Sequence, residues 1–332
     1  MIFFRDIIGH DDIIKGLKGA LKSGRVSHAY LFSGPEGVGK YTTAMAYAAS
    51  LLCSRPVDGD GCGGCGDCRR LSGGVHPELE IIRPEGATVK ISQIRQLGGS
   101  VRFGPSSGSR TVRIVDGADL MTAEAANSML RILEEPLPGV VFILVSSKPQ
   151  AVLPTIVSRC QNIYFEPLSN EQLVRGMSSR AGESGERLSL AAALAGGSLG
   201  RALGLLAGGL VMRDTAYSVI TRLDGASIEE VLSLAGEVAE KKEDVVPLLD
   251  LMILWFRDVL LYNETGGTGH LINFDRINEI KGLAGRYTTG LLILLIGYIN
   301  SARDSLAAGA NVQLTLEVLF IRLAGLGPEE VA

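Results

Sequence analysis

The chain has 332 residues, of which 46% are hydrophobic and 20% charged, and its formal net charge is −4. This length is too great for one small core and predicts two or three domains. The slightly acidic balance gives no general attraction to nucleic acid, so any DNA contact has to come from a local patch or from partner proteins.

The N-terminus and the apolar stretches predict a cytoplasmic protein without a membrane partner. The first residues, MIFFRD, lack the basic region, apolar run and cleavage site of a secretory signal. The longest uncharged apolar stretch, residues 291–299, is much shorter than the roughly 20 residues that span a bilayer. Thiols stay reduced in the cytoplasm, so clustered cysteines indicate a metal site rather than disulfides.

The first part of the chain alternates between helical and strand-like patterns. Residues 11–22 repeat apolar side chains at helical spacing, and a buried strand at 29–33 runs into a glycine-rich turn and a helix at 40–52. After an insert at 54–76 that is rich in Gly, Cys and Asp, the expected elements are strands at 80–83, 111–116, 140–146 and 162–165 and a helix at 122–134 that stops before Pro136. This alternation predicts a parallel α/β sheet with helices on both faces.

No strand pattern follows the first domain, which ends near Pro167. Short helices with glycine breaks are expected next, and then longer helices, of which the strongest patterns lie at 247–262 and 289–306. We therefore expect three domains: an α/β P-loop domain at 1–167 with an insert at 53–68, a small helical lid domain at 168–208, and an all-α collar domain at 209–332.

A phosphate-binding loop follows the first predicted strand and opens a helix. Its pattern, G-x-x-x-x-G-K, runs from Gly34 to Lys40. Gly34, Gly37 and Gly39 let backbone N–H groups turn towards phosphate, and the helix N-terminus adds its dipole. Lys40 is expected to reach the terminal phosphates of a nucleotide.

The residue after this lysine departs from the working pattern. A Ser or Thr there holds Mg²⁺ through its hydroxyl, whereas this chain has Tyr41. Thr42 comes one place later, about 100° round the helix, and cannot simply substitute. Tyr41 is either a tolerated surface residue in a loop that still binds nucleotide, or the mark of a site that binds Mg-nucleotide poorly or never turns over. We favour the second interpretation, which makes ATP and Mg²⁺ doubtful cofactors.

A second acidic motif lies at the end of the predicted strand 111–116. Asp116 stands where a Walker B aspartate is expected, at the carboxyl end of a parallel strand beside the phosphate loop. In proteins that hydrolyse nucleotide with these two motifs, the residue after the aspartate is usually a Glu that orients the attacking water. Here that residue is Gly117. Asp119 is interpreted as a helix cap. Two catalytic elements are therefore missing.

Four cysteines predict a structural zinc site. Cys53, Cys62, Cys65 and Cys68 supply four thiols, three of them in a glycine-rich turn that can wrap around one ion. Four thiolates close the site, which leaves no open position for chemistry. An iron–sulfur cluster is a minor alternative. Four unrelated buried cysteines are a poor explanation, because the segment is polar and cannot form a core. We treat His76 as a bystander.

Several segments together resemble bacterial DNA polymerase III clamp-loader subunits of the AAA+ superfamily. The resemblance covers roughly the first two hundred residues and is carried by the phosphate loop, the four-cysteine insert and the segments at 7–10, 27–34, 121–136 and 153–160. It implies an AAA+ domain, a small helical lid and a helical collar that packs against other subunits. Leu251, Ile253, Leu254, Trp255 and Val259 are candidate anchors of that collar or, for most of them, ordinary core residues of their own domain.

Within that family, three departures favour the delta-prime type over the gamma/tau motors. Tyr41 and Gly117 are two of them, and Gly200 stands where motors carry a phosphate-sensing Arg, with Arg201 one place off. The resemblance then implies a stator that supports loading of the sliding clamp onto primed DNA. Its implied partners are gamma/tau and delta subunits in a hetero-oligomeric ring, and the clamp and primer–template DNA through the complex.

The resemblance also implies two site residues. Arg159, in the run Ser158–Cys160, would project into the ATP site of a neighbouring subunit as an arginine finger, a role that suits a charged, bidentate guanidinium. The alternative is a structural arginine that caps a helix or pairs with a carboxylate. Ser147 matches a sensor position that reads phosphate and is interpreted as vestigial.

Two other functions compete with the stator. The first is an active AAA+ motor of the gamma/tau type with an unorthodox phosphate loop. The second is a zinc-dependent nucleic-acid-binding protein with an incidental phosphate loop. The acidic net charge counts against the second, since only Arg69 and Arg70 stand beside the cysteine cluster.

Overall fold

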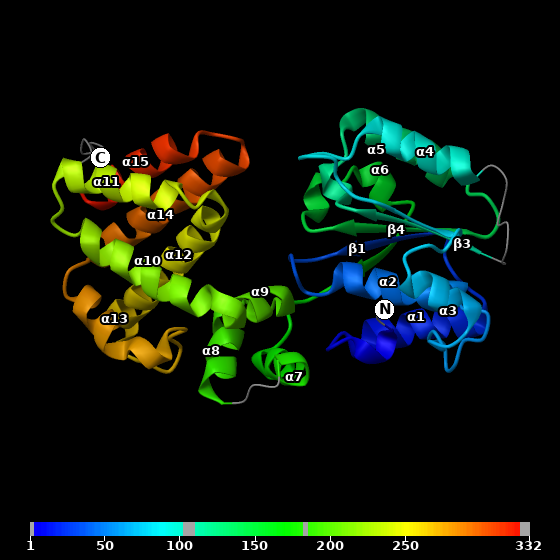
Figure 1. Cartoon of the computed structure of the whole chain (residues 1–332), viewed down its shortest axis with the longest axis horizontal. Helices are drawn as coiled ribbons and strands as arrows, with labels where there is room; N and C mark the ends of the chain where they lie inside the picture. The colour runs from blue at the N-terminus through cyan, green and yellow to red at the C-terminus, as the bar shows by residue number, and fades with distance from the viewer. Residues whose placement is uncertain (1–2, 102–109, 182–184, 326–332) are drawn as a thin grey trace. The chain divides into compact units, whose positions relative to one another are not determined.

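The computed structural model describes residues 3–101, 110–181 and 185–325 (Figure 1). The chain divides into two compact units, one of Met1–Ala181 with Gly196–Arg201 and the other of Gly182–Ala195 with Ala202–Ala332. The predicted class, an α/β domain followed by helices, is confirmed. The division into three domains with bounds at 167 and 208 stays a prediction.

The first unit is built on a five-stranded parallel sheet with the order β2-β3-β4-β1-β5. Its strands are β1 (Ala29–Ser33), β2 (Leu79–Ile82), β3 (Thr111–Asp116), β4 (Val140–Ser146) and β5 (Gln161–Tyr164). The strand with Asp116 therefore does not pair with the strand before the phosphate loop, because β4 lies between β1 and β3. All the expected strands are present, with bounds that differ by one residue at β2 and β5.

Alternation along the strands divides the core of this unit between the two faces of the sheet. Tyr30 and Phe32 of β1 pack on one face, with α1 (Asp11–Ser23) and α2 (Lys40–Leu52). Ala29 and Leu31 pack on the other, with α4 (Ile91–Val101), α5 (Ala123–Glu134) and α6 (Pro154–Val157). Figure 1 shows these two helical layers on either side of the strands. The sheet is thereby buried on both faces, as parallel sheets are.

Three helices of the first unit were not predicted, namely α3 (Gly66–Ser72), α4 and α6. α3 lies inside the cysteine-rich insert, and Cys65 is its N-cap residue. α4 lies between β2 and β3, and its buried Ile94 and Leu97 pack under the sheet. The remaining elements of this unit are the 3₁₀ turns η1 (Phe4–Asp6), η2 (Ala118–Leu120) and η3 (Pro149–Ala151) and the helix α7 (Asn170–Ala181).

The second unit is helical in the residues described. Its elements are α8 (Glu186–Leu194), α10 (Leu210–Leu223), α11 (Ile228–Ala239), α12 (Lys242–Thr265), η5 (Phe274–Arg276), α13 (Ile277–Ala284), α14 (Thr289–Ala307) and α15 (Val312–Leu323). α9 (Leu199–Gly204) and a π turn (Leu205–Gly209) precede α10. α12 starts at Lys242, five residues before the start that we expected at Pro247. The helix accommodates this proline near its N-terminus.

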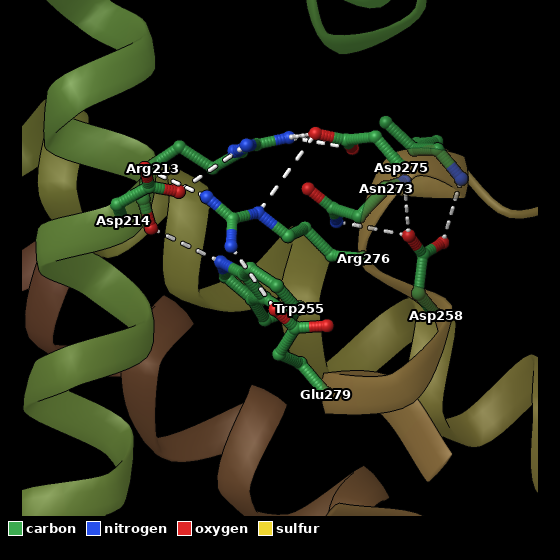
Figure 2. Close-up of polar contacts among 9 residues, drawn as sticks. Arg213, Asp214, Trp255, Asp258, Asn273, Asp275, Arg276 and Glu279 are labelled. Carbon is green, nitrogen blue, oxygen red and sulfur yellow. Dashed lines mark hydrogen bonds and ion pairs between the residues drawn. The ribbon is translucent and has the colours of Figure 1, made fainter.

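A buried polar network joins three helices of the second unit (Figure 2). Arg213 of α10 is 4% exposed and forms two hydrogen bonds with Asp275, at 2.8 and 2.9 Å. Asp258 of α12 is fully buried and accepts hydrogen bonds from the backbone N–H groups of Ile272 and Asn273. These bonds fix the segment before α13, because a buried charge left without partners is costly.

Among the described residues, one helical stretch, Leu199–Leu223, is long and apolar enough to cross a membrane, and a bent pair, Phe274–Ala284 with Thr289–Ala307, passes the same test only together. Buried helices of globular proteins also meet this criterion. The first stretch contains Arg213, whose guanidinium is ion-paired inside the unit.

Candidate functional site

The phosphate loop joins the end of β1 to the start of α2. Gly34, Gly37 and Gly39 have φ values of +139°, +75° and +109°, a region that side chains disfavour. Space is also tight at two of them: a Cβ atom at Gly34 would lie 2.2 Å from the carbonyl oxygen of Phe165, and one at Gly37 would lie 2.1 Å from Ser198 Oγ. The backbone conformation and the close packing of the loop therefore require glycine at these positions, whatever the loop binds.

Lys40 is the first residue of α2 and is only 4% exposed. Its ammonium donates to the carbonyl oxygens of Gly34, at 2.7 Å, and Pro35, and to Ser147 Oγ at 3.2 Å. Burial lowers the pKa of Lys40, and the carboxylates of Glu36, Asp119 and Asp116 act in the opposite direction. The ammonium thus ties the loop to the end of β4.

Asp116 ends β3, and Ser147 directly follows the neighbouring strand β4. Burial raises the pKa of Asp116, opposed by the nearby charges of Arg83 and Lys40. The interpretation of Asp119 as a helix cap is wrong, because Gly117 is the N-cap residue of η2. The carboxylate of Asp119 instead accepts a hydrogen bond from the backbone N–H of Ser147, at 3.1 Å. Asp119 therefore positions the backbone of Ser147.

Arg83 is a residue of this site that no sequence pattern led us to expect. It follows β2 directly, and its Nη2 donates to the phenolic oxygen of Tyr41 at 2.7 Å. Its Nε lies 3.7 Å from Asp116 Oδ2. Thr42 is half-buried on α2, one position beyond Tyr41. An arginine directly after the strand that pairs with β3 was the available signal, because parallel strands end at the same edge.

The segment after Gly197 lies directly on the phosphate loop. Gly200, at the expected sensor position, donates its backbone N–H to the carbonyl oxygen of Gly37 at 3.5 Å. Ser198 Oγ accepts the backbone N–H of Arg201 at 3.2 Å. A glycine at position 200 places backbone, and no guanidinium, beside the loop.

The four cysteines of the insert lie together. All four Sγ atoms are within 4.8 Å of one another, and three pairs of sulfur atoms lie 3.7, 3.8 and 4.0 Å apart. Four sulfurs bound tetrahedrally at Zn–S distances of about 2.3 Å would be about 3.8 Å apart. The four side chains, those of Cys53, Cys62, Cys65 and Cys68, therefore fit one tetrahedral metal ion.

The electrostatics of the thiols differ within this cluster. Burial raises the pKa of Cys53 and Cys68. Burial acts in the same direction on Cys65, but hydrogen bonds, including one from the backbone N–H of Cys68, prevail and lower its pKa to about 5. His76 is no ligand in this geometry: its Nε2 lies 3.4 Å from Asp67 Oδ1. A bound cation would favour the thiolate form of all four cysteines.

The insert is anchored to the N-terminus of the chain by Asp60. This carboxylate is 4% exposed and accepts the backbone N–H groups of Phe4, at 3.1 Å, and Arg5, at 3.2 Å. Ser50 Oγ, on the α2 helix that leads into Cys53, also donates to it, at 3.4 Å. The cysteine module therefore packs within its own chain, against η1 and α2.

Arg159 follows α6 and lies apart from the phosphate loop. Its side chain is 36% exposed. Nη2 donates to Glu134 Oε1 at 2.8 Å, and Nη1 donates to the carbonyl oxygen of Thr155 at 2.9 Å. The guanidinium is thus oriented by its own chain while more than a third of the side chain remains accessible. Cys160, next to it, is buried, and burial raises its pKa to about 12.

The strand order, the phosphate loop and the acid at the end of β3 define a P-loop protein of the AAA+ class, joined here to a helical C-terminal unit. Two family models match the chain: "DNA polymerase III, delta subunit" at residues 9–169 and "DNA polymerase III, delta subunit, C terminal" at residues 214–325. Together with the relatives below, they show that the chain belongs to the DNA polymerase III delta-prime subunit family. The predicted delta-prime role is thereby confirmed.

Two curated delta-prime subunits resemble nearly the whole chain. That of Bacillus subtilis is 30% identical over 94% of this chain and 95% of its own length. That of Pseudomonas aeruginosa is 32% identical over 91% of this chain and 93% of its own length. The tau subunit of Bacillus subtilis is 27% identical over 99% of this chain, which spans only 62% of that longer protein.

Two solved structures match the chain at low identity and with low TM-scores. A gamma subunit-related protein of Thermotoga maritima covers 94% of this chain, with a TM-score of 0.45 and 16% identity, and the match includes 98% of that protein. The Bacillus subtilis clamp loader delta protein covers 94% of this chain, with a TM-score of 0.38 and 14% identity, and the match includes 99% of it.

The close contact between the phosphate loop and Ser198 gives a test of this geometry. Gly37→Ala is expected to lower the free energy of unfolding by about 1–3 kcal/mol, because it combines a strained φ with a steric clash. Gly39→Ala is the matched control: it has the same kind of strain, but no heavy atom lies within 4 Å of its added Cβ, so the loss should be smaller.

The readout is urea unfolding followed by far-UV circular dichroism. Adding Ser198→Gly to Gly37→Ala should recover part of the lost stability, because it removes the atom that the new Cβ meets. Equal losses in the two glycine variants, together with no recovery, would contradict the packing described.

Proposed function

We propose that this delta-prime clamp-loader subunit acts as a stator that does not hydrolyse ATP and that supplies Arg159 to the ATP site of a neighbouring gamma/tau subunit. The observation that carries the proposal is that the accessible guanidinium and the altered nucleotide site lie on different segments of the chain. The chain presents an oriented, accessible guanidinium on one segment, while its own nucleotide site lacks the hydroxyl residue that helps to hold Mg²⁺ and the residue that activates water.

The state of Arg159 supports a role outside its own chain. An exposed ion pair such as that with Glu134 contributes roughly 0–1 kcal/mol, so the guanidinium can leave it at little cost. Two hydrogen bonds nevertheless orient its fork. A guanidinium placed on a transferring phosphoryl group stabilises the charge that spreads over its oxygens.

The phosphate loop supports the absence of turnover in this subunit. Tyr41 replaces the hydroxyl residue that binds Mg²⁺, and Gly117 has no side chain to orient water. Gly200 presents only backbone to the loop. These three positions serve three different steps, so restoring one of them would not restore hydrolysis.

The wider assignment follows from the family. We propose that the subunit works in the cytoplasm within a ring of gamma/tau and delta subunits, and that it reaches the sliding clamp and primer–template DNA through that complex. Its helical C-terminal unit would be the collar part. We further propose that the cysteine module holds one structural Zn²⁺, because four thiolates leave no position open for chemistry and the module is built into the chain's own N-terminal packing.

Reconstitution with the cognate gamma/tau and delta subunits tests the arginine finger. Arg159→Ala should slow the adjoining ATP site by roughly 10³-fold or more in clamp- and DNA-stimulated hydrolysis. Lys40→Ala should leave turnover close to that of the unaltered complex. Arg159→Lys keeps the charge but not the fork and should not restore the rate.

The control for lost surface charge is Arg175→Ala, an exposed arginine on α7 that should leave turnover unchanged. Gel filtration of each complex checks that assembly is intact. If Lys40→Ala removes a share of turnover and Arg159→Ala does not, the chain is a motor of the gamma/tau type and the stator proposal is wrong.

Metal analysis of the purified full chain tests the zinc proposal. We expect one zinc ion per chain, and Cys68→Ser should abolish it and lower Tm by roughly 5–10 °C, because the buried thiol cluster loses its central ion. Cys160→Ser is the matched control, a buried cysteine outside the cluster, and should retain the ion. Bound iron, or equal metal loss in both variants, would refute the assignment.

A further inference from the structure

The guanidinium of Arg83 bridges two side chains from different elements. It donates to the phenolic oxygen of Tyr41 on α2 at 2.7 Å, with its central carbon 5.0 Å from the centre of the Tyr41 ring. It also lies 3.7 Å from the Asp116 carboxylate at the end of β3. One protein cation therefore contacts both residues.

These two residues occupy the positions that hold Mg²⁺ in hydrolytic P-loop proteins. There the hydroxyl residue after the P-loop lysine and the Walker B aspartate bind the ion together. In this chain the first position is Tyr41 and the second is Asp116. Where a divalent ion would gather a hydroxyl and a carboxylate, a guanidinium gathers a phenol and a carboxylate.

Two protein cations lie near Asp116, although burial and the neighbouring carboxylate of Asp119 raise its pKa. Arg83 and the ammonium of Lys40 both favour its ionised form against the effect of burial. A guanidinium keeps its positive charge throughout the physiological pH range and is covalently fixed in place. Mg²⁺ also demands near-ideal octahedral oxygen ligands and gives up its water reluctantly. To bind here it would have to displace Arg83 and accept a bulky phenol in place of a hydroxyl.

We propose that Arg83 takes the place of Mg²⁺ in this phosphate site, and that the Tyr41–Arg83 pair excludes the ion. A phosphate group that approaches the loop would meet the ammonium of Lys40 and the guanidinium of Arg83 in place of a metal. Arg83 is accessible to such a group, since its side chain is 61% exposed. The inference does not depend on Arg159 and concerns the isolated subunit.

The test compares ADP binding with Mg²⁺ and with EDTA, by isothermal titration of the full chain. Four proteins are needed: the unaltered chain, Tyr41→Thr, Arg83→Ala and the double variant. In the unaltered chain Mg²⁺ should change the affinity for ADP by less than about twofold. In the double variant Mg²⁺ should tighten ADP binding by on the order of tenfold, because both the cation and the phenol are gone.

Each single variant separates the two contributions. Tyr41→Thr alone should gain little, because Arg83 still neutralises Asp116. Arg95→Ala, which removes an exposed arginine of α4, controls for net charge and should behave like the unaltered chain. Circular dichroism checks that each variant is folded.

Three results would overturn the proposal. The first is Mg²⁺-dependent ADP binding by the unaltered chain. The second is a full gain in Tyr41→Thr alone, which would make Arg83 irrelevant. The third is a folded double variant in which Mg²⁺ has no effect on ADP binding. None of these results bears on Arg159, so this inference can fail while the stator proposal stands.

Discussion

The carboxyl ends of parallel strands meet at one edge of the sheet, and the whole phosphate site depends on that constraint. Four strand ends deliver its side chains: Lys40 through the loop after β1, Arg83 after β2, Asp116 at the end of β3 and Ser147 after β4. The backbone fixes where these side chains lie but not what they are. The frame of a nucleotide site can therefore persist while its chemistry changes.

This separation of frame and chemistry explains why the loop is so well formed. Gly34 and Gly37 are required by contacts with Phe165 and Ser198, and the buried Lys40 ties the loop to β4. The loop is thus part of the stable core of the first unit even if no nucleotide is ever hydrolysed. The exposed guanidinium of Arg159 lies on a different segment, so loss of turnover at one place is compatible with a catalytic contribution at the other.

Local patterns in the sequence predicted the class of fold, the phosphate loop and the cysteine cluster, because each depends on residues close together along the chain. The contacts that give the site its character are long-range. Arg83 and Tyr41 are 42 residues apart, and no local pattern pairs them. The role of Asp119 was misassigned for the same reason: its partner, Ser147, is 28 residues away, directly after β4. Helix α4 was missed although Ile91, Ile94 and Leu97 recur at helical spacing, because Gly98 and Gly99 in the same run disfavour a helix.

The central claim is that this subunit completes a neighbour's site and hydrolyses nothing itself. The most direct test assembles it with cognate gamma/tau subunits whose own P-loop lysines have been replaced, so that only Lys40 remains in a phosphate loop of the ring. Hydrolysis of ATP is then measured with clamp and primed DNA present. The account predicts no turnover above that of a complex carrying Lys40→Ala as well. Turnover that disappears only when Lys40 is replaced would contradict it.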